Sequence, residues 1–200
     1  MQLKHIAFLT LSAVSTFAMA EGFDVVVVGS GGAGLSSAIT AKESGATVVV
    51  LEKMAYIGGN SNFASGGMNA AGTKQQLAAG VTQDSPELFY KDTMKGGHNL
   101  NNPALLKTLT ENAKYAEEWL VDLGAKFCFR KGRGGGQSIA RGHGPCDGSA
   151  VGPEILRVLT ERAAKDGIAI RTENQVVKIV MKNGAVAGVE VKLSLIHISE

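Results

Sequence analysis

The fold is decided by residues 23–34, which read Phe23-Asp24-Val25-Val26-Val27-Val28-Gly29-Ser30-Gly31-Gly32-Ala33-Gly34. The four valines are typical of a parallel strand buried on both faces, and the glycines follow them directly. Residues 35–44 have helical composition, Gly45 is a helix stop signal, and residues 47–51 are a second β-branched run. This order predicts a complete βαβ unit, and therefore an α/β fold with a parallel sheet.

The glycine spacing in this unit predicts a dinucleotide-binding turn. Gly29 allows the tight turn, Gly31 lets the backbone approach a pyrophosphate, and Gly34 permits close packing of the helix on the strand. The amides of residues 32–35 would then point toward the phosphates. Glu52 lies 18 residues beyond Gly34, near the roughly 20 expected of the acid that binds the ribose, and its charge would repel a 2′-phosphate. This context favours dinucleotide binding over a purely structural glycine turn.

Composition excludes several classes of protein. Of the 200 residues, 44% are hydrophobic and 19% are charged, and the net charge is +2. These values are typical of a globular protein of about one domain, and they exclude a disordered polyelectrolyte and a dedicated nucleic-acid binder. Cys128 and Cys146 are too few for a disulfide scaffold or a cysteine-rich metal site, and we expect no bound metal. The two cysteines could pair with each other in an oxidising compartment.

Residues 1–20 have the pattern of a secretory signal peptide. Lys4 gives a positive start, residues 6–17 are almost wholly apolar or small, and Ala18-Met19-Ala20 fits a cleavage site. The apolar run is shorter than the roughly 20 residues needed to span a bilayer, which argues against a membrane anchor. A buried helix is the other alternative. We therefore expect an exported, periplasmic protein without a membrane span, whose mature chain begins at Glu21.

Two further glycine-dense loops follow the second predicted strand. They are Lys53-Met54-Ala55-Tyr56-Ile57-Gly58-Gly59-Asn60-Ser61 and Ala64-Ser65-Gly66-Gly67-Met68-Asn69-Ala70. A domain for NAD alone would continue with helix and strand, whereas such loops let the backbone lie close to the bulky ring of FAD. With these residues the sequence resembles the flavoprotein superfamily of fumarate reductase and succinate dehydrogenase, particularly the periplasmic flavocytochrome c fumarate reductases. The resemblance runs from about residue 23 to 191 and includes Asp84-Ser85-Pro86-Glu87.

The resemblance implies non-covalently bound FAD, because residues 60–63 lack the histidine to which membrane-complex relatives link their flavin. It also implies that Gly66 faces the substrate and that the backbone of Val177 borders the adenine, although a sheet-core valine explains Val177 equally well. Together with the glycine turn, the residues expected to bind FAD are Gly29, Gly31, Gly32, Ala33, Gly34, Glu52, Lys53, Gly59, Asn60, Ser61, Ser65, Gly66, Gly67 and Val177.

Most of the remaining chain is expected to be scaffold. After the cap and first-turn proline Asn102-Pro103, the spacing predicts a helix to Gly124 whose apolar stripe is Leu105, Leu109, Ala113, Ala116, Leu120 and Leu123. A second helix is predicted over 153–165. Asn183-Gly184 predicts an antiparallel hairpin of strands 175–181 and 185–191, which matches the small insertion in the resembling fold.

Residues 132–148 are predicted to be a glycine-rich loop that holds Arg141 and His143. Nucleophilic or metal chemistry is disfavoured there, because no second pair of ligands has metal-binding spacing. The resembling family carries an Arg-x-His-Arg-Pro-like segment at this place, near the flavin. In this sequence Gly144 replaces the second arginine of that segment.

The chain ends on Leu193-Ser194-Leu195-Ile196-His197-Ile198-Ser199-Glu200, which resembles the translation of an adapter used in sequencing libraries, with an ordinary edge strand as the alternative. We therefore divide the chain into a signal peptide over 1–20, the N-terminal part of a Rossmann-like FAD-binding domain over 21–192, and a non-native tail over 193–200. On this division the chain is the front of a truncated, longer protein.

These observations predict an exported FAD-dependent reductase of the C=C bond of a small unsaturated carboxylate, such as fumarate or a related acrylate. No Cys-x-x-Cys-His haem motif occurs in the sequence, so a separate cytochrome c type donor would supply the electrons. The resembling family takes its proton donor and carboxylate-binding residues from later sequence, so no catalytic residue is assigned and this chain alone is expected to be inactive. Two alternatives stay open: an FAD oxidase or dehydrogenase of an amino acid or steroid, and a non-catalytic flavin electron-transfer module.

Overall fold

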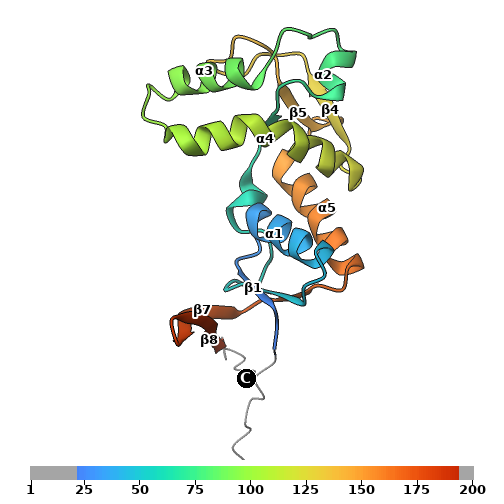
Figure 1. The fold of residues 1–200 in the computed structure, drawn as a ribbon. Coiled ribbons are helices and arrows are strands. Elements are labelled where there is room, and N and C mark those ends of the chain that lie inside the picture. Colours follow the sequence, from blue (N-terminus) through green and yellow to red (C-terminus); the bar gives the residue numbers. More distant parts are fainter. Residues whose placement is uncertain (1–21, 194–200) are drawn as a thin grey trace, which may run out of the picture.

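The structure is a computed structural model that describes residues 22–193 (Figure 1). The predicted βαβ unit is present as β1 (Val25–Val28), α1 (Gly32–Glu43) and β2 (Val48–Leu51). Strand β2 pairs in parallel with β1 on one side and with β6 (Ala169–Arg171) on the other, which gives the strand order β1-β2-β6. The expected α/β architecture with a parallel sheet is therefore confirmed.

The first two strands of this sheet differ in burial. All four residues of β2 are buried, because this strand is central and packs against α1. Burial on both faces was expected of β1 and is wrong for the described chain, since three of its valines are half-buried and Val28 is 60% exposed. The physical reason is position, because β1 is the edge strand of the sheet that residues 22–193 form.

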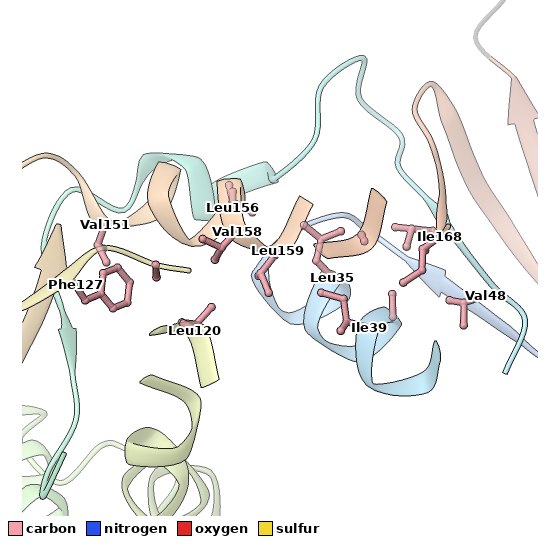
Figure 2. Packing of buried hydrophobic residues seen from close by; sticks show 14 residues of the cluster. Leu35, Ile39, Val48, Leu120, Phe127, Val151, Leu156, Val158, Leu159 and Ile168 are labelled. Atoms are coloured by element: carbon pink, nitrogen blue, oxygen red, sulfur yellow. The ribbon is translucent and has the colours of Figure 1, made fainter. Parts of the chain in front are cut away.

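The main hydrophobic core lies between α1, α5 (Val151–Lys165) and the sheet, and Figure 2 shows its side chains. It extends from Val48 and Ile168 beside the sheet to Phe127 and Val151 near the other half of the molecule. Each fully buried leucine of this kind contributes about 1.5–3 kcal/mol relative to an exposed one. The helix predicted over 153–165 is α5, and it begins two residues earlier.

The other half of the molecule lies at the opposite end of α5 from β7 (Asn174–Lys182) and β8 (Ala185–Leu193) (Figure 1). Strands β3 (Met68–Asn69), β5 (Gly142–Pro145) and β4 (Phe127–Arg130) form an antiparallel sheet in the order β3-β5-β4. The prediction of a loop over 132–148 is therefore wrong for β5. Its Gly-His-Gly-Pro sequence has low strand propensity, and pairing with a strand on each side overrides that propensity.

Three helices accompany this sheet: α2 (Lys74–Ala78), α3 (Pro86–Gly96) and α4 (Pro103–Asp122). The predicted cap of α4 is confirmed, because the Asn102 side chain accepts hydrogen bonds from the helix's first amides. The predicted apolar stripe is wrong at Leu105, Leu109 and Ala116, which are exposed. Two polar residues occupy the buried face, so apolar spacing alone misplaced it; the buried residues are Leu106, Thr110, Ala113, Glu117 and Leu120.

The predicted hairpin is confirmed as β7 (Asn174–Lys182) and β8 (Ala185–Leu193). Asn183 and Gly184 have φ values of 53° and 80°, as a two-residue type I′ turn requires. In residues 22–193 no helix combines the length and the apolar character needed to cross a bilayer. The predicted signal peptide and residues 194–200 of the predicted tail lie outside the described residues.

Candidate functional site

A cavity of about 680 Å³ lies at the carboxyl ends of β1 and β2. This edge of a parallel α/β sheet is where such folds bind ligands, because the helix N-termini also point there. The start of the hairpin closes the cavity on another side. Its lining residues are Val28, Gly29, Gly31, Leu51, Glu52, Lys53, Met54, Tyr56, Gly59, Asn60, Asn174, Gln175 and Val176.

The glycine turn has the geometry that a dinucleotide requires. Gly29 has a φ of +98°, and a Cβ built on Gly34 would lie 2.0 Å from the Gly29 carbonyl oxygen, so only glycine allows this close approach of helix and strand. Of the four amides of residues 32–35 that were expected to point toward the phosphates, two donate to acceptors within the protein: the Gly32 amide to Ser61 Oγ and the Leu35 amide to the Gly31 carbonyl oxygen. The amides of Ala33 and Gly34 have no acceptor among the described residues, and they are available to phosphate oxygens.

The carboxylate of Glu52 is fixed beside this turn and is 5% exposed. Its Oε2 accepts hydrogen bonds from the amide and hydroxyl of Ser30, at 2.9 and 2.7 Å, and its Oε1 accepts one from the Met54 amide at 2.9 Å. Burial raises the pKa of Glu52, but these hydrogen bonds outweigh burial and hold the pKa below its usual value. Glu52 is therefore ionised at neutral pH, and a carboxylate accepts about four hydrogen bonds, which leaves capacity for a ribose hydroxyl.

Comparison with known proteins identifies the fold that carries this site. The model of a family described as FAD binding domain matches residues 24–198. The chain belongs to this family of FAD-binding domains. Its cofactor is FAD, and the free helix amides, the ionised Glu52 and the cavity beside them fit that cofactor.

Three known proteins illustrate the likeness. The chain is 50% identical over 169 residues to "NADH:fumarate oxidoreductase" of Klebsiella pneumoniae and 47% identical over 170 residues to "Fumarate reductase (cytochrome)" of Shewanella frigidimarina, each alignment covering 84% of this chain. A solved structure of a flavocytochrome c3 fumarate reductase in its open conformation has a TM-score of 0.79 and 40% identity over 84% of this chain. The chain spans only 18%, 29% and 30% of the lengths of these three proteins.

The cavity collects six of the residues predicted to bind FAD: Gly29, Gly31, Glu52, Lys53, Gly59 and Asn60. Ser61 lies behind them in η1 (Gly59–Phe63), where its Oγ accepts a hydrogen bond of 3.0 Å from the Gly32 amide. Ser65, Gly66 and Gly67 follow η1 as an exposed segment and do not line the cavity.

Val177 also lies outside the cavity lining, and its side chain is 56% exposed, so the sheet-core explanation is wrong. The register of β7 against β8 shifts at this point: Val176 pairs with Val191 and Lys178 with Glu190, which leaves Val177 without a cross-strand partner. A residue at such a bulge is left out of the ladder. The neighbouring Val176 does line the cavity.

Sequence reasoning missed Asn174 and Gln175, which begin β7 and line the cavity. The Asn174 amide donates to the Glu52 carbonyl oxygen at 2.8 Å, and the Glu52 amide donates to the Arg171 carbonyl oxygen at 2.8 Å. Strand β6 has only three residues and therefore a weak pattern in the sequence. Recognising that β6 pairs with β2 would have placed the start of β7 beside Glu52.

The Arg141 and His143 pair forms a different, structural site in the other half of the molecule. The guanidinium of Arg141 makes two hydrogen bonds to Asp84, at 2.9 and 2.6 Å, and one to Asp92 at 2.7 Å. The Nε2 atom of His143 lies 2.8 Å from the hydroxyl of Thr73, and burial lowers the pKa of His143. Arg141 is 1% exposed and His143 is 0% exposed, so neither side chain is open to a ligand.

The two cysteines form a disulfide between Cys128 in β4 and Cys146 directly after β5, with Cα atoms 4.9 Å apart. The pairing that the sequence left open is therefore present. The disulfide closes the glycine-rich segment between the two strands and is typical of proteins in oxidising compartments.

Proposed function

We propose that the protein is an exported, FAD-dependent reductase of the C=C bond of a small unsaturated carboxylate. The observation that carries the proposal is the cavity beside Glu52 and the free amides of Ala33 and Gly34, on a chain similar to proteins named for fumarate reduction. The catalytic residues are not among those we assign.

The described residues bind and orient the cofactor. The amides of Ala33 and Gly34 would donate to the pyrophosphate, and Glu52 would accept a hydrogen bond from the ribose. The backbone of Val177, left out of the strand ladder, is our candidate for the adenine edge. When bound, FAD supplies the hydride that the C=C bond receives. We propose non-covalent attachment, so acid precipitation of the protein should release all the FAD into the supernatant.

Glu52 offers a direct test of cofactor binding. Glu52→Lys removes a hydrogen bond to a charged group, worth about 1.5–3 kcal/mol, and places a cation near the helix N-terminus. We expect FAD to bind at least about 10-fold more weakly, measured by quenching of flavin fluorescence. Glu111→Lys, on the exposed side of α4, is the matched control and should leave the FAD dissociation constant unchanged. An unchanged FAD dissociation constant in Glu52→Lys would contradict a role for Glu52 in FAD binding.

The reaction itself is tested by anaerobic assay of the FAD-loaded full-length protein with reduced methyl viologen, because this chain spans only 18% and 29% of the two relatives named for fumarate reduction and is expected to be inactive alone. Fumarate, acrylate, methacrylate and urocanate are offered separately, and we expect at least one to consume two electrons and two protons per molecule of saturated product. If none is reduced while an amino acid or steroid reduces an artificial acceptor, the protein is a dehydrogenase. If no substrate reacts in either direction, the electron-transfer alternative replaces the proposal.

The electron donor is a separate question, because the two relatives are named for different donors, NADH and a cytochrome. We propose a separate cytochrome c type donor. When the protein and an unsaturated carboxylate are mixed with reduced cytochrome c in a stopped-flow instrument, the haem of the cytochrome should be oxidised. NADH offered in place of the cytochrome should not be consumed. Oxidation of NADH by the purified protein would contradict this assignment.

We also propose that the protein is periplasmic. The Cys128–Cys146 disulfide supports an oxidising compartment, as does the signal-peptide pattern of residues 1–20. Mass spectrometry of the native protein should find Glu21 at the N-terminus. An intact Met1 on protein recovered from the cytoplasm would contradict export.

A further inference from the structure

The guanidinium of Arg130, at the end of β4, lies against two glycines from neighbouring segments. A Cβ built on Gly144 of β5 would lie 2.5 Å from Nη2, 2.8 Å from Cζ and 2.9 Å from Nε of Arg130. A Cβ built on Gly67 would lie 3.6 Å from Nη1. The space that the guanidinium occupies therefore exists because position 144 has no side chain, and it adjoins the segment that ends at Gly67.

Arg130 has no carboxylate partner among residues 22–193, unlike several other arginines. Arg141, Arg157 and Arg162 each form ion pairs with two carboxylates. The hydrogen bond of Arg130 is one of 3.4 Å from Nη2 to the carbonyl oxygen of Ser149. A guanidinium has five N–H donors arranged as a fork, so most of the donors of this partly exposed side chain remain available.

The backbone near Arg130 is exposed at Gly66, in a segment that follows the cavity-lining residues along the chain. Gly66 is exposed, and nothing lies within 4 Å of a Cβ built on it. The segment of residues 64–67 continues directly from η1, whose Gly59 and Asn60 line the cavity. The carbonyl oxygen of Ala64 accepts a hydrogen bond of 2.9 Å from Gly152, at the start of α5, which fixes this segment.

We propose that Arg130 is a carboxylate-binding residue that holds a small carboxylate over the exposed backbone at Gly66. The planar fork of a guanidinium matches the two oxygens of a carboxylate, and the pair is strong where no internal anion competes. The identification of this carboxylate with the substrate rests on the proposed function. The binding site itself rests on the position and the missing ion pair of Arg130.

The test measures binding rather than turnover: equilibrium dialysis of isotope-labelled fumarate against the FAD-loaded protein at low salt. Arg130→Gln should weaken binding about 10- to 100-fold, the loss expected when hydrogen bonds from a charged donor are removed. Gly144→Ala keeps the arginine but places a Cβ where its guanidinium lies, so it should also weaken binding. Arg133→Gln is the control, because Arg133 lies in the adjacent segment with a hydrogen bond only to the carbonyl of Ser138. Arg133→Gln should bind fumarate as tightly as wild type does. Flavin content and circular dichroism should show that every variant is folded.

Four outcomes would overturn the inference: no fumarate binding by wild type at millimolar concentration, unchanged binding in Arg130→Gln, unchanged binding in Gly144→Ala, or an equal loss in Arg133→Gln. Inorganic phosphate that competes as well as succinate would replace the carboxylate assignment with a general oxyanion site. The proposed function fails separately. A full-length wild-type protein that binds fumarate through Arg130 but accepts no electrons from viologen would refute the reductase proposal and leave the binding site standing.

Discussion

The two halves of the molecule are stabilised in different ways. The nucleotide half, made of β1, α1, β2, α5 and β6, has a large core of leucine, isoleucine and valine side chains (Figure 2). The polar half, made of α2, α3, α4 and β3 to β5, contributes Leu120 and Phe127 to that core and has a small apolar cluster of its own, formed by Ala70, Ala71, Phe89 and Ala113. Its other fully buried side chains include Arg141, His143, Gln76 and Thr73. Removal of one side chain from an apolar core leaves a cavity, whereas removal of one partner from a buried ion pair leaves an uncompensated charge.

The largest expected effect follows from Arg141. Arg141→Met would leave the Asp84 carboxylate buried without its cation and should destabilise the polar half by about 3–5 kcal/mol. Hydrogen exchange should show early loss of protection in β4 and β5 while β2 stays protected. Arg157→Met is the control, because Arg157 also contacts two carboxylates but is 38% exposed, and its loss should cost less than about 1 kcal/mol. Equal losses in the two variants would contradict a special role for burial.

A second prediction concerns Glu117, a buried residue of α4 whose Oε1 has no hydrogen-bond partner. Burial, and then repulsion from Glu118 and Asp122, raises the pKa of Glu117 from 4.5 to about 7. The folded protein therefore binds this proton more tightly than the unfolded chain, and the free energy of unfolding falls as pH rises from about 4.5 to about 7. The loss is about 3 kcal/mol.

Glu117→Gln should remove that pH dependence and stabilise the protein by about 3 kcal/mol at pH 8, with little change at pH 4. Urea unfolding across this range is the measurement. Glu111→Gln, exposed on the same helix, should keep the wild-type profile. If the free energy of unfolding depended on pH in the same way in wild type and Glu117→Gln, the pKa of Glu117 would not be raised in the folded protein.

The disulfide is the third contribution to the polar half. Cys128 and Cys146 are 18 residues apart, and closing a loop of that length removes about 3 kcal/mol of unfolded-chain entropy in the chain-entropy model. Reduction should therefore lower the denaturant midpoint. The double variant Cys128→Ser with Cys146→Ser should match the reduced protein and should not respond to reductant. A double variant as stable as the oxidised protein would show that strand pairing alone holds β4 against β5.

The difference between the halves also explains what the sequence could predict. Val25 to Val28, the glycine turn and Glu52 carry short-range patterns, so the βαβ unit and half of the cavity could be predicted. Strand β5 could not, because Gly142 to Pro145 become a strand only through their neighbours. The buried face of α4 contains the polar residues Thr110 and Glu117. Apolar spacing alone therefore predicted the wrong face of this helix. Asn174 and Gln175 enter the site through sheet order, which no local pattern encodes.

The smallest expected effect compares two helix N-termini. Helix α4 is capped by its own sequence: Oδ1 of Asn102 accepts hydrogen bonds from the amides of Ala104 and Leu105, at 3.0 and 3.2 Å. Helix α1 has no side-chain cap, and its Ala33 and Gly34 amides have no acceptor among residues 22–193. Asn102→Ala should therefore cost about 1 kcal/mol of stability and leave the FAD dissociation constant unchanged.

Asn112→Ala is the control for this variant, because Asn112 lies on the exposed face of the same helix, where its Nδ2 donates only to the Thr108 carbonyl oxygen. Urea unfolding should give a lower free energy of unfolding for Asn102→Ala than for Asn112→Ala. If the two are equal, the cap contributes nothing that the α3–α4 packing does not already supply. If Asn102→Ala instead weakens FAD, the two halves are coupled, and an N-terminus in the polar half acts on the cofactor through the core they share at Leu120 and Phe127.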